Sequence, residues 1–174
     1  RAAFITVSDG ATANMYGNVT LQNRKSTGNA CIVIMGSKSV FNMRGGVTEN
    51  CSRAAIADSG ATFHMFDGEI KDCKVNGDGV ILVNDESKFI MDGGTISGCK
   101  ADAGGGLYAD NSTVTINNGT ISECTAAIKE GGGLYATNGS TININSGTIS
   151  KCTAQADNGG GLYADNSTVT ISGG

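Results

Sequence analysis

Short runs in which apolar and polar residues alternate recur along the whole chain. Between residues 104 and 124 three such runs occur, and their apolar members are Leu107, Ala109, Val114, Ile116 and Ile121. Alternation with a period of two predicts β-strands with one buried face. Gly, Asn, Asp and Ser separate the runs, and these residues favour turns. Apolar residues keep a helical spacing for no more than a turn or two, so the pattern predicts an all-β chain.

This unit of three runs repeats along the chain. The segment GGGLYA occupies residues 104–109, 131–136 and 159–164, and the segment GTIS-x-Cys occupies residues 94–99, 119–124 and 147–152. Toward the N-terminus the identity decays, but a glycine keeps its place in every unit. These glycines are Gly17, Gly46, Gly68, Gly94, Gly119, Gly147 and Gly174, with spacings between 22 and 29 residues.

A unit of this length with three short strands predicts one coil of a single-stranded parallel β-helix. One coil cannot bury its own apolar stripe, whereas stacked coils share a continuous core. A leucine-rich repeat would require a regular L-x-x-L-x-L frame, which is absent. The crossover rule for parallel strands predicts a right-handed helix. We therefore expect a single domain over residues 1–174 with about seven coils. Its uncapped ends predict a segment of a longer rod or end-to-end self-association.

The composition is that of a solenoid and excludes several classes of protein. The chain has 27 Gly and no Pro in 174 residues, whereas collagen requires both residues in quantity. Internal strands need every backbone N–H for pairing, which accounts for the absence of Pro. A net charge of −4 argues against a nucleic-acid partner, because phosphate binding requires clustered Lys and Arg. No apolar stretch approaches the roughly 20 residues of a membrane helix, so no membrane span is expected in this segment.

Cysteine occupies one position of five successive coils, at Cys51, Cys73, Cys99, Cys124 and Cys152. One interpretation is a ladder of buried thiols that act as small core residues. The other is disulfides between neighbouring coils, such as Cys51–Cys73 and Cys99–Cys124. Adjacent parallel strands place Cα atoms ~4.8 Å apart, within the disulfide range, but an oxidising compartment is then required. A linear column of sulfurs does not surround a zinc ion, so no metal site is expected.

Tyrosine forms a second column, at Tyr108, Tyr135 and Tyr163. Each follows a leucine that is expected to face inward, so the tyrosines are expected to face outward. Stacked aromatic side chains stabilise neighbouring strands. Alternatively, these tyrosines form, with Asp110 and Asp165, an aromatic and acidic strip for a glycan or protein ligand. The column is expected to cover only the last three coils, because Ile81 and Ala57 are assigned to the equivalent positions earlier in the chain.

No catalytic or cofactor-binding signature occurs in the sequence. Glycoside hydrolysis needs a pair of carboxylates, but here the acidic residues recur at equivalent positions of the repeat, as expected for a structural surface.

His64, the single histidine, is expected to point outward as an ordinary surface residue. Cys31 is expected to face the core from another strand. N-x-[ST] sequons matter only if the host glycosylates; they lie at Asn18, Asn50, Asn111, Asn118, Asn138 and Asn166.

The GGGLYA and GTIS-x-Cys elements resemble the repeats of polymorphic outer-membrane proteins and related bacterial adhesin-like surface proteins. Those repeats carry a GG-[aliphatic]-[Ile/Tyr] element, which residues 105–108, 132–135 and 160–163 match. They also carry an aromatic-x-x-Asn element, and Ile96–Cys99 has Ile and Cys at the corresponding places. The resemblance covers residues 94–174 most clearly. It implies a parallel β-helix in a secreted or cell-surface setting.

Three functional hypotheses follow from the repeat and the resemblance. The first is an extracellular β-helical adhesin or structural stalk without catalysis, which binds a glycan or protein ligand. The second is a self-assembling filament subunit. The third is a fragment of a polysaccharide-active lyase or hydrolase, which would require a non-repeating cluster of charged residues in one coil.

Overall fold

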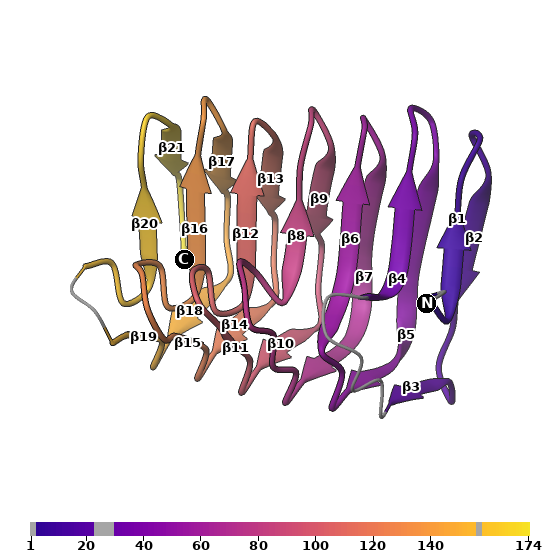
Figure 1. Ribbon diagram of the computed structural model, residues 1–174, viewed down its shortest axis with the longest axis horizontal. Helices are drawn as coiled ribbons and strands as arrows, with labels where there is room; N and C mark the ends of the chain where they lie inside the picture. The colour runs from indigo at the N-terminus through magenta and orange to yellow at the C-terminus, as the bar shows by residue number, and fades with distance from the viewer. Residues whose placement is uncertain (1–2, 23–29, 156–157) are drawn as a thin grey trace.

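The strands of the chain stack along one axis as a parallel β-solenoid (Figure 1). The computed structural model describes residues 3–22, 30–155 and 158–174. Every strand pairing within these ranges is parallel, and no helix occurs in them. The expected all-β solenoid is thereby confirmed.

The first sheet runs the full length of the rod. Its seven strands are β1 (Ile5–Val7), β4 (Ala30–Met35), β6 (Arg53–Asp58), β8 (Ile81–Val83), β12 (Leu107–Asp110), β16 (Leu134–Thr137) and β20 (Leu162–Ala164). From β1 to β20 the chain completes six turns, close to the predicted number of coils.

The second sheet contains the other two runs of each coil. Its strands are β2 (Thr12–Met15), β3 (Thr20–Gln22), β5 (Val40–Glu49), β7 (Thr62–Lys71), β9 (Lys88–Met91), β10 (Thr95–Ser97), β13 (Thr113–Ile116), β14 (Thr120–Ser122), β17 (Thr141–Ile144), β18 (Thr148–Ser150) and β21 (Thr168–Ile171). In the later coils the two runs are separate strands, as expected. In β5 and β7, each ten residues long, they form one continuous strand. The pairing of β5 with β7 shifts register around Arg44, where the strand bends.

A third, smaller sheet was not expected from the sequence. It contains β11 (Lys100–Ala101), β15 (Thr125–Ala126) and β19 (Thr153–Ala154). These strands have two residues each, which is too short for an alternating pattern to be visible. The later coils therefore have a fourth side.

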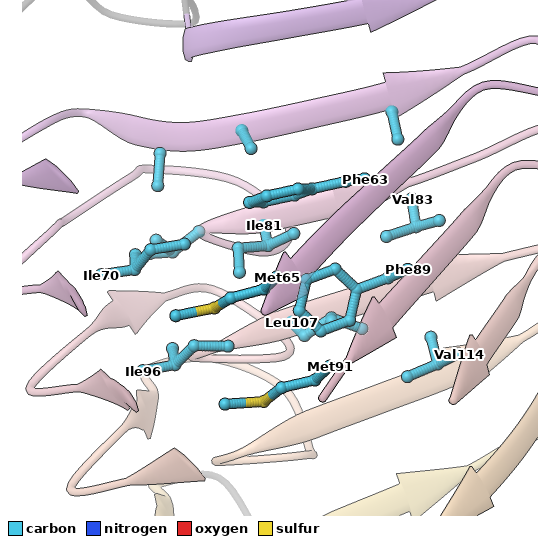
Figure 2. Close-up of a cluster of buried hydrophobic side chains, with 14 of the residues drawn as sticks. Phe63, Met65, Ile70, Ile81, Val83, Phe89, Met91, Ile96, Leu107 and Val114 are labelled. Atoms are coloured by element: carbon cyan, nitrogen blue, oxygen red, sulfur yellow. The ribbon is translucent and has the colours of Figure 1, made fainter. Parts of the chain in front are cut away.

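The core is a set of columns that run along the rod axis. Phe41, Phe63, Phe89 and Val114 pair in register in one column, and Met43, Met65, Met91 and Ile116 pair in the next. The rings of Phe63 and Phe89 pack edge to face with centroids 5.3 Å apart, and Figure 2 shows Met65 and Met91 stacked beside them. All these side chains are buried, as the alternation predicted.

The frame glycines make the turn between the two parts of the second sheet. Gly94 has φ +84°, and a Cβ atom there would lie 2.6 Å from Cε of Met65 and 2.7 Å from the carbonyl oxygen of Gly68. Both the backbone conformation and the available space therefore require glycine. This close approach brings the third strand of each coil, and the cysteine that follows it, against the core.

Candidate functional site

The cysteine column lies at the corner between the second and third sheets. The residue before each cysteine has a positive φ: Asn50 at 52°, Asp72 at 53°, Gly98 at 61°, Glu123 at 56° and Lys151 at 54°. This left-handed residue ends the third strand and turns the next side chain inward. Cys73, Cys99 and Cys124 are buried and Cys152 is half-buried. The variable residue in GTIS-x-Cys is therefore a corner residue.

Backbone hydrogen bonds hold successive cysteines in register. The N–H of Lys100 donates to the carbonyl oxygen of Cys73 at 2.9 Å, and the N–H of Thr125 donates to the carbonyl oxygen of Cys99 at 2.8 Å. The N–H of Thr153 donates to the carbonyl oxygen of Cys124 at 2.9 Å. Adjacent cysteines are thus neighbours in a parallel ladder, with Cα atoms ~4.8 Å apart.

The four free thiols interact along the column. Hydrogen bonds from Cys152 and Cys99 lower the pKa of Cys124. The same contacts raise the pKa of Cys99 and of Cys152, because a thiol that donates to its neighbour holds its own proton more tightly. A hydrogen bond from Cys99 likewise lowers the pKa of Cys73. The protonation states of neighbouring thiols in the column are therefore linked.

The disulfide of the chain joins Cys31 to Cys51, with Cα atoms 6.6 Å apart. The disulfides between neighbouring coils that the second interpretation named, Cys51–Cys73 and Cys99–Cys124, are therefore not formed. Cys73, Cys99, Cys124 and Cys152 are free thiols, as in the first interpretation. Cys31 is buried in β4, in agreement with its expected inward orientation.

The geometry of one coil explains this pairing. Cys31 lies in register with Ala54, and further along the same column stand Val80, Gly106 and Gly133. These positions face the cysteine column across the coil. A Cβ atom at Gly106 would lie 3.3 Å from Sγ of Cys124, and one at Gly133 would lie 3.2 Å from Sγ of Cys152. Only in the coil of Cys51 is the opposing residue a cysteine, so the bond forms within that coil.

The tyrosine column lies on the outer face of the first sheet. The rings of Tyr108 and Tyr135 stack with centroids 5.0 Å apart and an interplanar angle of 4°. Those of Tyr135 and Tyr163 are 5.1 Å apart, tilted by 31°. The adjacent Leu107 and Leu134 are buried, as the alternation predicted. Because the rings cover each other's faces, the column presents ring edges and hydroxyl groups to the outside.

The column of outward side chains that contains the tyrosines extends further toward the N-terminus, which was not predicted from the repeat. Tyr108 pairs in register with Leu82, Leu82 with Ile56, and Ile56 with Val33. All are half-buried. The assignment of Ile81 and Ala57 to this column is wrong, because Ile81 pairs with the inward Leu107 and Ala57 with the inward Val83. A shift of one residue moves every side chain to the opposite face.

We call this uninterrupted row of side chains the outer ladder. Its members are Val33, Ile56, Leu82, Tyr108, Tyr135 and Tyr163.

Carboxylates accompany the tyrosines of the outer ladder. Asp110 ends β12, and its Oδ1 accepts a hydrogen bond from Nδ2 of Asn138 at 2.7 Å. Burial, with smaller contributions from Asp78 and Asp110, raises the pKa of Tyr108 to about 12. Burial and then Asp165 raise the pKa of Tyr135. The hydroxyls of Tyr108 and Tyr135 therefore keep their protons at neutral pH and remain available as hydrogen-bond donors.

A cluster on the outer face of the second sheet interrupts the repeat. The Nε2 atom of His64 lies 2.6 Å from Oδ2 of Asp92. The rings of His64 and Phe66 stack with their centroids 3.7 Å apart. The guanidinium carbon of Arg44 lies 4.1 Å from the centroid of the Phe66 ring. Hydrogen bonds from Asn117 and then His64 lower the pKa of Asp92. His64 is partly exposed, as expected, and the departure from the repeat at these positions was the signal that could have identified the cluster.

The last described coil leaves part of the core open. A pocket of about 200 Å³ is lined by Ile116, Ile144, Ile149 and Ile171, among others. Ile171 is 69% exposed there.

Within residues 3–22, 30–155 and 158–174, no group of three or more His, Cys, Asp or Glu side chains is arranged to hold a metal ion. The same ranges contain no helix that could span a membrane. Comparison of the chain with protein-family models, with curated proteins and with solved structures finds no match.

Proposed function

We propose that this chain is a non-catalytic module of an extracellular or cell-surface protein, with the outer ladder as its contact face for a glycan or protein ligand. The observation that carries the proposal is the continuity of the ladder. Six partly exposed apolar and aromatic side chains follow one another in register from Val33 to Tyr163. A contiguous row of apolar side chains that reaches the surface is a candidate interaction site.

The form of the ladder favours an elongated ligand. Neighbouring side chains repeat at the spacing of parallel strands, ~4.8 Å, in a straight row along the sheet. Such a row offers many equivalent contacts to an extended polymer rather than a single enclosed pocket. The protonated hydroxyls of Tyr108 and Tyr135, and the carboxylates of Asp110 and Asp165, can supply hydrogen bonds beside the apolar contacts.

The disulfide supports the extracellular part of the proposal. Structural disulfides persist in oxidising compartments and are rare in the cytosol. Cys31 and Cys51 are both buried in the core. An adhesin or stalk on the cell surface would keep this cross-link.

Replacement of Tyr135 with Ala is expected to abolish most of the binding to a ligand of this face. Tyr135 contacts both Tyr108 and Tyr163, so its removal interrupts the ladder at the middle of the aromatic part. Loss of a central aromatic contact costs about 2 kcal/mol or more in an interface, which corresponds to roughly thirtyfold weaker binding. Surface plasmon resonance against a panel of immobilised extracellular polysaccharides and matrix proteins measures this change.

Two variants serve as controls for Tyr135→Ala. Tyr135→Phe keeps the stacked ring and removes the hydroxyl, so it separates the ring contact from the hydrogen bond. Tyr16→Ala removes a tyrosine that is 59% exposed after β2, away from the outer ladder, and should leave binding unchanged. Equal binding of Tyr135→Ala and the unmodified chain, or turnover of a polysaccharide by the pure protein, would contradict the proposal.

A further inference from the structure

Carboxylates flank the outer ladder on the side where its strands begin. A Cβ atom placed at Gly79, which follows Asp78, would lie 2.6 Å from Cβ of Tyr108. A Cβ atom placed at Gly131, which follows Glu130, would lie 2.9 Å from Cβ of the next tyrosine in the column. The segments that carry these two acids are therefore packed closely against the tyrosines.

A second row of carboxylates flanks the ladder on the side where its strands end. Asp110 ends β12 two residues after Tyr108, so both side chains point to the outer face of the first sheet. The N–H of Asp165 donates to the carbonyl oxygen of Ala136 at 2.8 Å, which places Asp165 at the equivalent position beyond Tyr163. The tyrosine column therefore lies between two rows of carboxylates on neighbouring strands of the first sheet (Figure 1).

The charges of both rows act on the tyrosine side chains. Burial, and then the charges of Asp78 and Asp110, raise the pKa of Tyr108 to about 12. Burial, and then the charge of Asp165, raise the pKa of Tyr135. Nearby negative charge disfavours the phenolate form, so the aromatic part of the ladder lies in a region of negative potential.

Two cations beside these carboxylates are already engaged within the chain. Nε of Arg53 donates to the carbonyl oxygen of Gly79 at 3.0 Å, and its Nη2 donates to the carbonyl oxygen of Asp78. Arg53 is thus held by backbone groups. Nζ of Lys129 lies 3.5 Å from Oδ1 of Asp78, and both side chains are exposed. Lys129 therefore occupies the place at Asp78 that a cation of a ligand would take.

We propose that the ligand of the outer ladder is a basic polypeptide in an extended conformation, whose Lys or Arg side chains lie on the apolar row and place their charged ends at the flanking carboxylates. The inference rests on the proposed function, because it names the class of ligand for that same face. Lys and Arg combine an apolar stem with a charged head, which suits an apolar row bordered by acids. Complementary charge of this kind selects the partner and speeds association.

Surface plasmon resonance of the chain against poly-L-lysine, poly-L-glutamate, chitosan and dextran tests the class of ligand. We expect the tightest binding to poly-L-lysine. This binding should weaken about tenfold or more between about 0.1 M and 1 M salt, over which the Debye length falls from ~10 to ~3 Å. Tighter binding to any of the other three polymers would overturn the inference. If Tyr135→Ala still removed that binding, the outer ladder would remain the contact face and only the class of ligand would be wrong.

The double variant Asp110→Asn/Asp165→Asn tests the flanking carboxylates. It should bind poly-L-lysine about fivefold more weakly than the unmodified chain, because two exposed charge contacts are lost. Asp67→Asn/Glu123→Gln is the matched control, since it changes the net charge equally at exposed residues of β7 and after β14, outside the first sheet. Equal losses in the two double variants would show attraction by net charge alone and would overturn the inference.

Lys129→Gln tests the opposite row of carboxylates. It removes the chain's own cation from Asp78, so poly-L-lysine should bind about twofold to threefold more tightly. Lys151→Gln is the matched control, because Nζ of Lys151 also lies 3.5 Å from a carboxylate oxygen, Oε1 of Glu123. An equal change in both lysine variants would contradict a role for Asp78. Circular dichroism of every variant separates a change in binding from a loss of folding.

Discussion

Replacement of Phe63 with Ala is expected to lower the free energy of unfolding by about 3–5 kcal/mol, the range for a fully buried aromatic side chain. Phe63 has no exposed surface. Its ring packs edge to face against Phe41 at 5.7 Å and against Phe89 at 5.3 Å. Removal of the ring thus leaves a cavity in the middle of the phenylalanine column and removes contacts from the coils on both sides. Urea denaturation followed by circular dichroism measures the loss.

Ile128→Ala is the matched control for Phe63→Ala. Ile128 is also a large apolar residue, but it is 62% exposed. Surface substitutions of this kind usually change stability by no more than about 0.5 kcal/mol. If the two variants lost similar amounts of stability, the continuous core assigned to residues 41–114 would be wrong.

The second large effect is expected from Gly105→Ala, in the middle glycine of the first GGGLYA segment. A Cβ atom at Gly105 would collide with the carbonyl oxygen of Gly132 and lie 2.5 Å from the carbonyl carbon of Thr125. Both obstacles are backbone atoms that cannot turn aside, Gly132 in the next coil and Thr125 across the same coil. The coils would have to separate locally, at a cost of about 3 kcal/mol or more. Thermal unfolding is expected to begin at a lower temperature in this variant.

Gly17→Ala is the control for Gly105→Ala. Neither glycine has a positive φ, and no atom lies within 4 Å of a Cβ placed at Gly17. The two substitutions therefore differ in the space around the new methyl group and not in backbone strain. Gly17→Ala should leave stability within about 1 kcal/mol of the unmodified chain. A Gly105→Ala variant of equal stability would show that the coils are not packed as closely as GGGLYA requires.

The fold could be predicted from the sequence because each coil repeats the same alternation of buried and exposed residues. The alternation in residues 113–116, for example, indicates which face of β13 is buried. The same pattern returns one coil later in residues 141–144, which indicates that β17 is the strand that pairs with β13. The third sheet could not be predicted, because two residues such as Thr125 and Ala126 carry no period. The joining of two runs in β7 could not be predicted either, because the glycine between them, Gly68 with φ +104°, looks in the sequence like the glycines that separate the strands of the later coils.

The candidate site was predicted less completely, for two physical reasons. The disulfide depends on which residues face each other across a coil, and repeat alignment shows only which residues stack along the axis. Cys31 and Cys51 face each other across one coil, whereas Cys51 and Cys73 stack along the axis. The outer ladder was truncated at Tyr108 because Ile81 and Leu82 are both aliphatic, so hydrophobicity alone does not show which of the two faces outward.

Amide hydrogen exchange of the chain, free and bound to the member of the ligand panel that it binds most tightly, is the most direct test of the outer ladder as the contact face. We expect slower exchange on binding in β8, β12, β16 and β20, the strands that carry Leu82, Tyr108, Tyr135 and Tyr163. Exchange in β9, β13, β17 and β21 of the second sheet should not change. Protection confined to the second sheet would contradict the account.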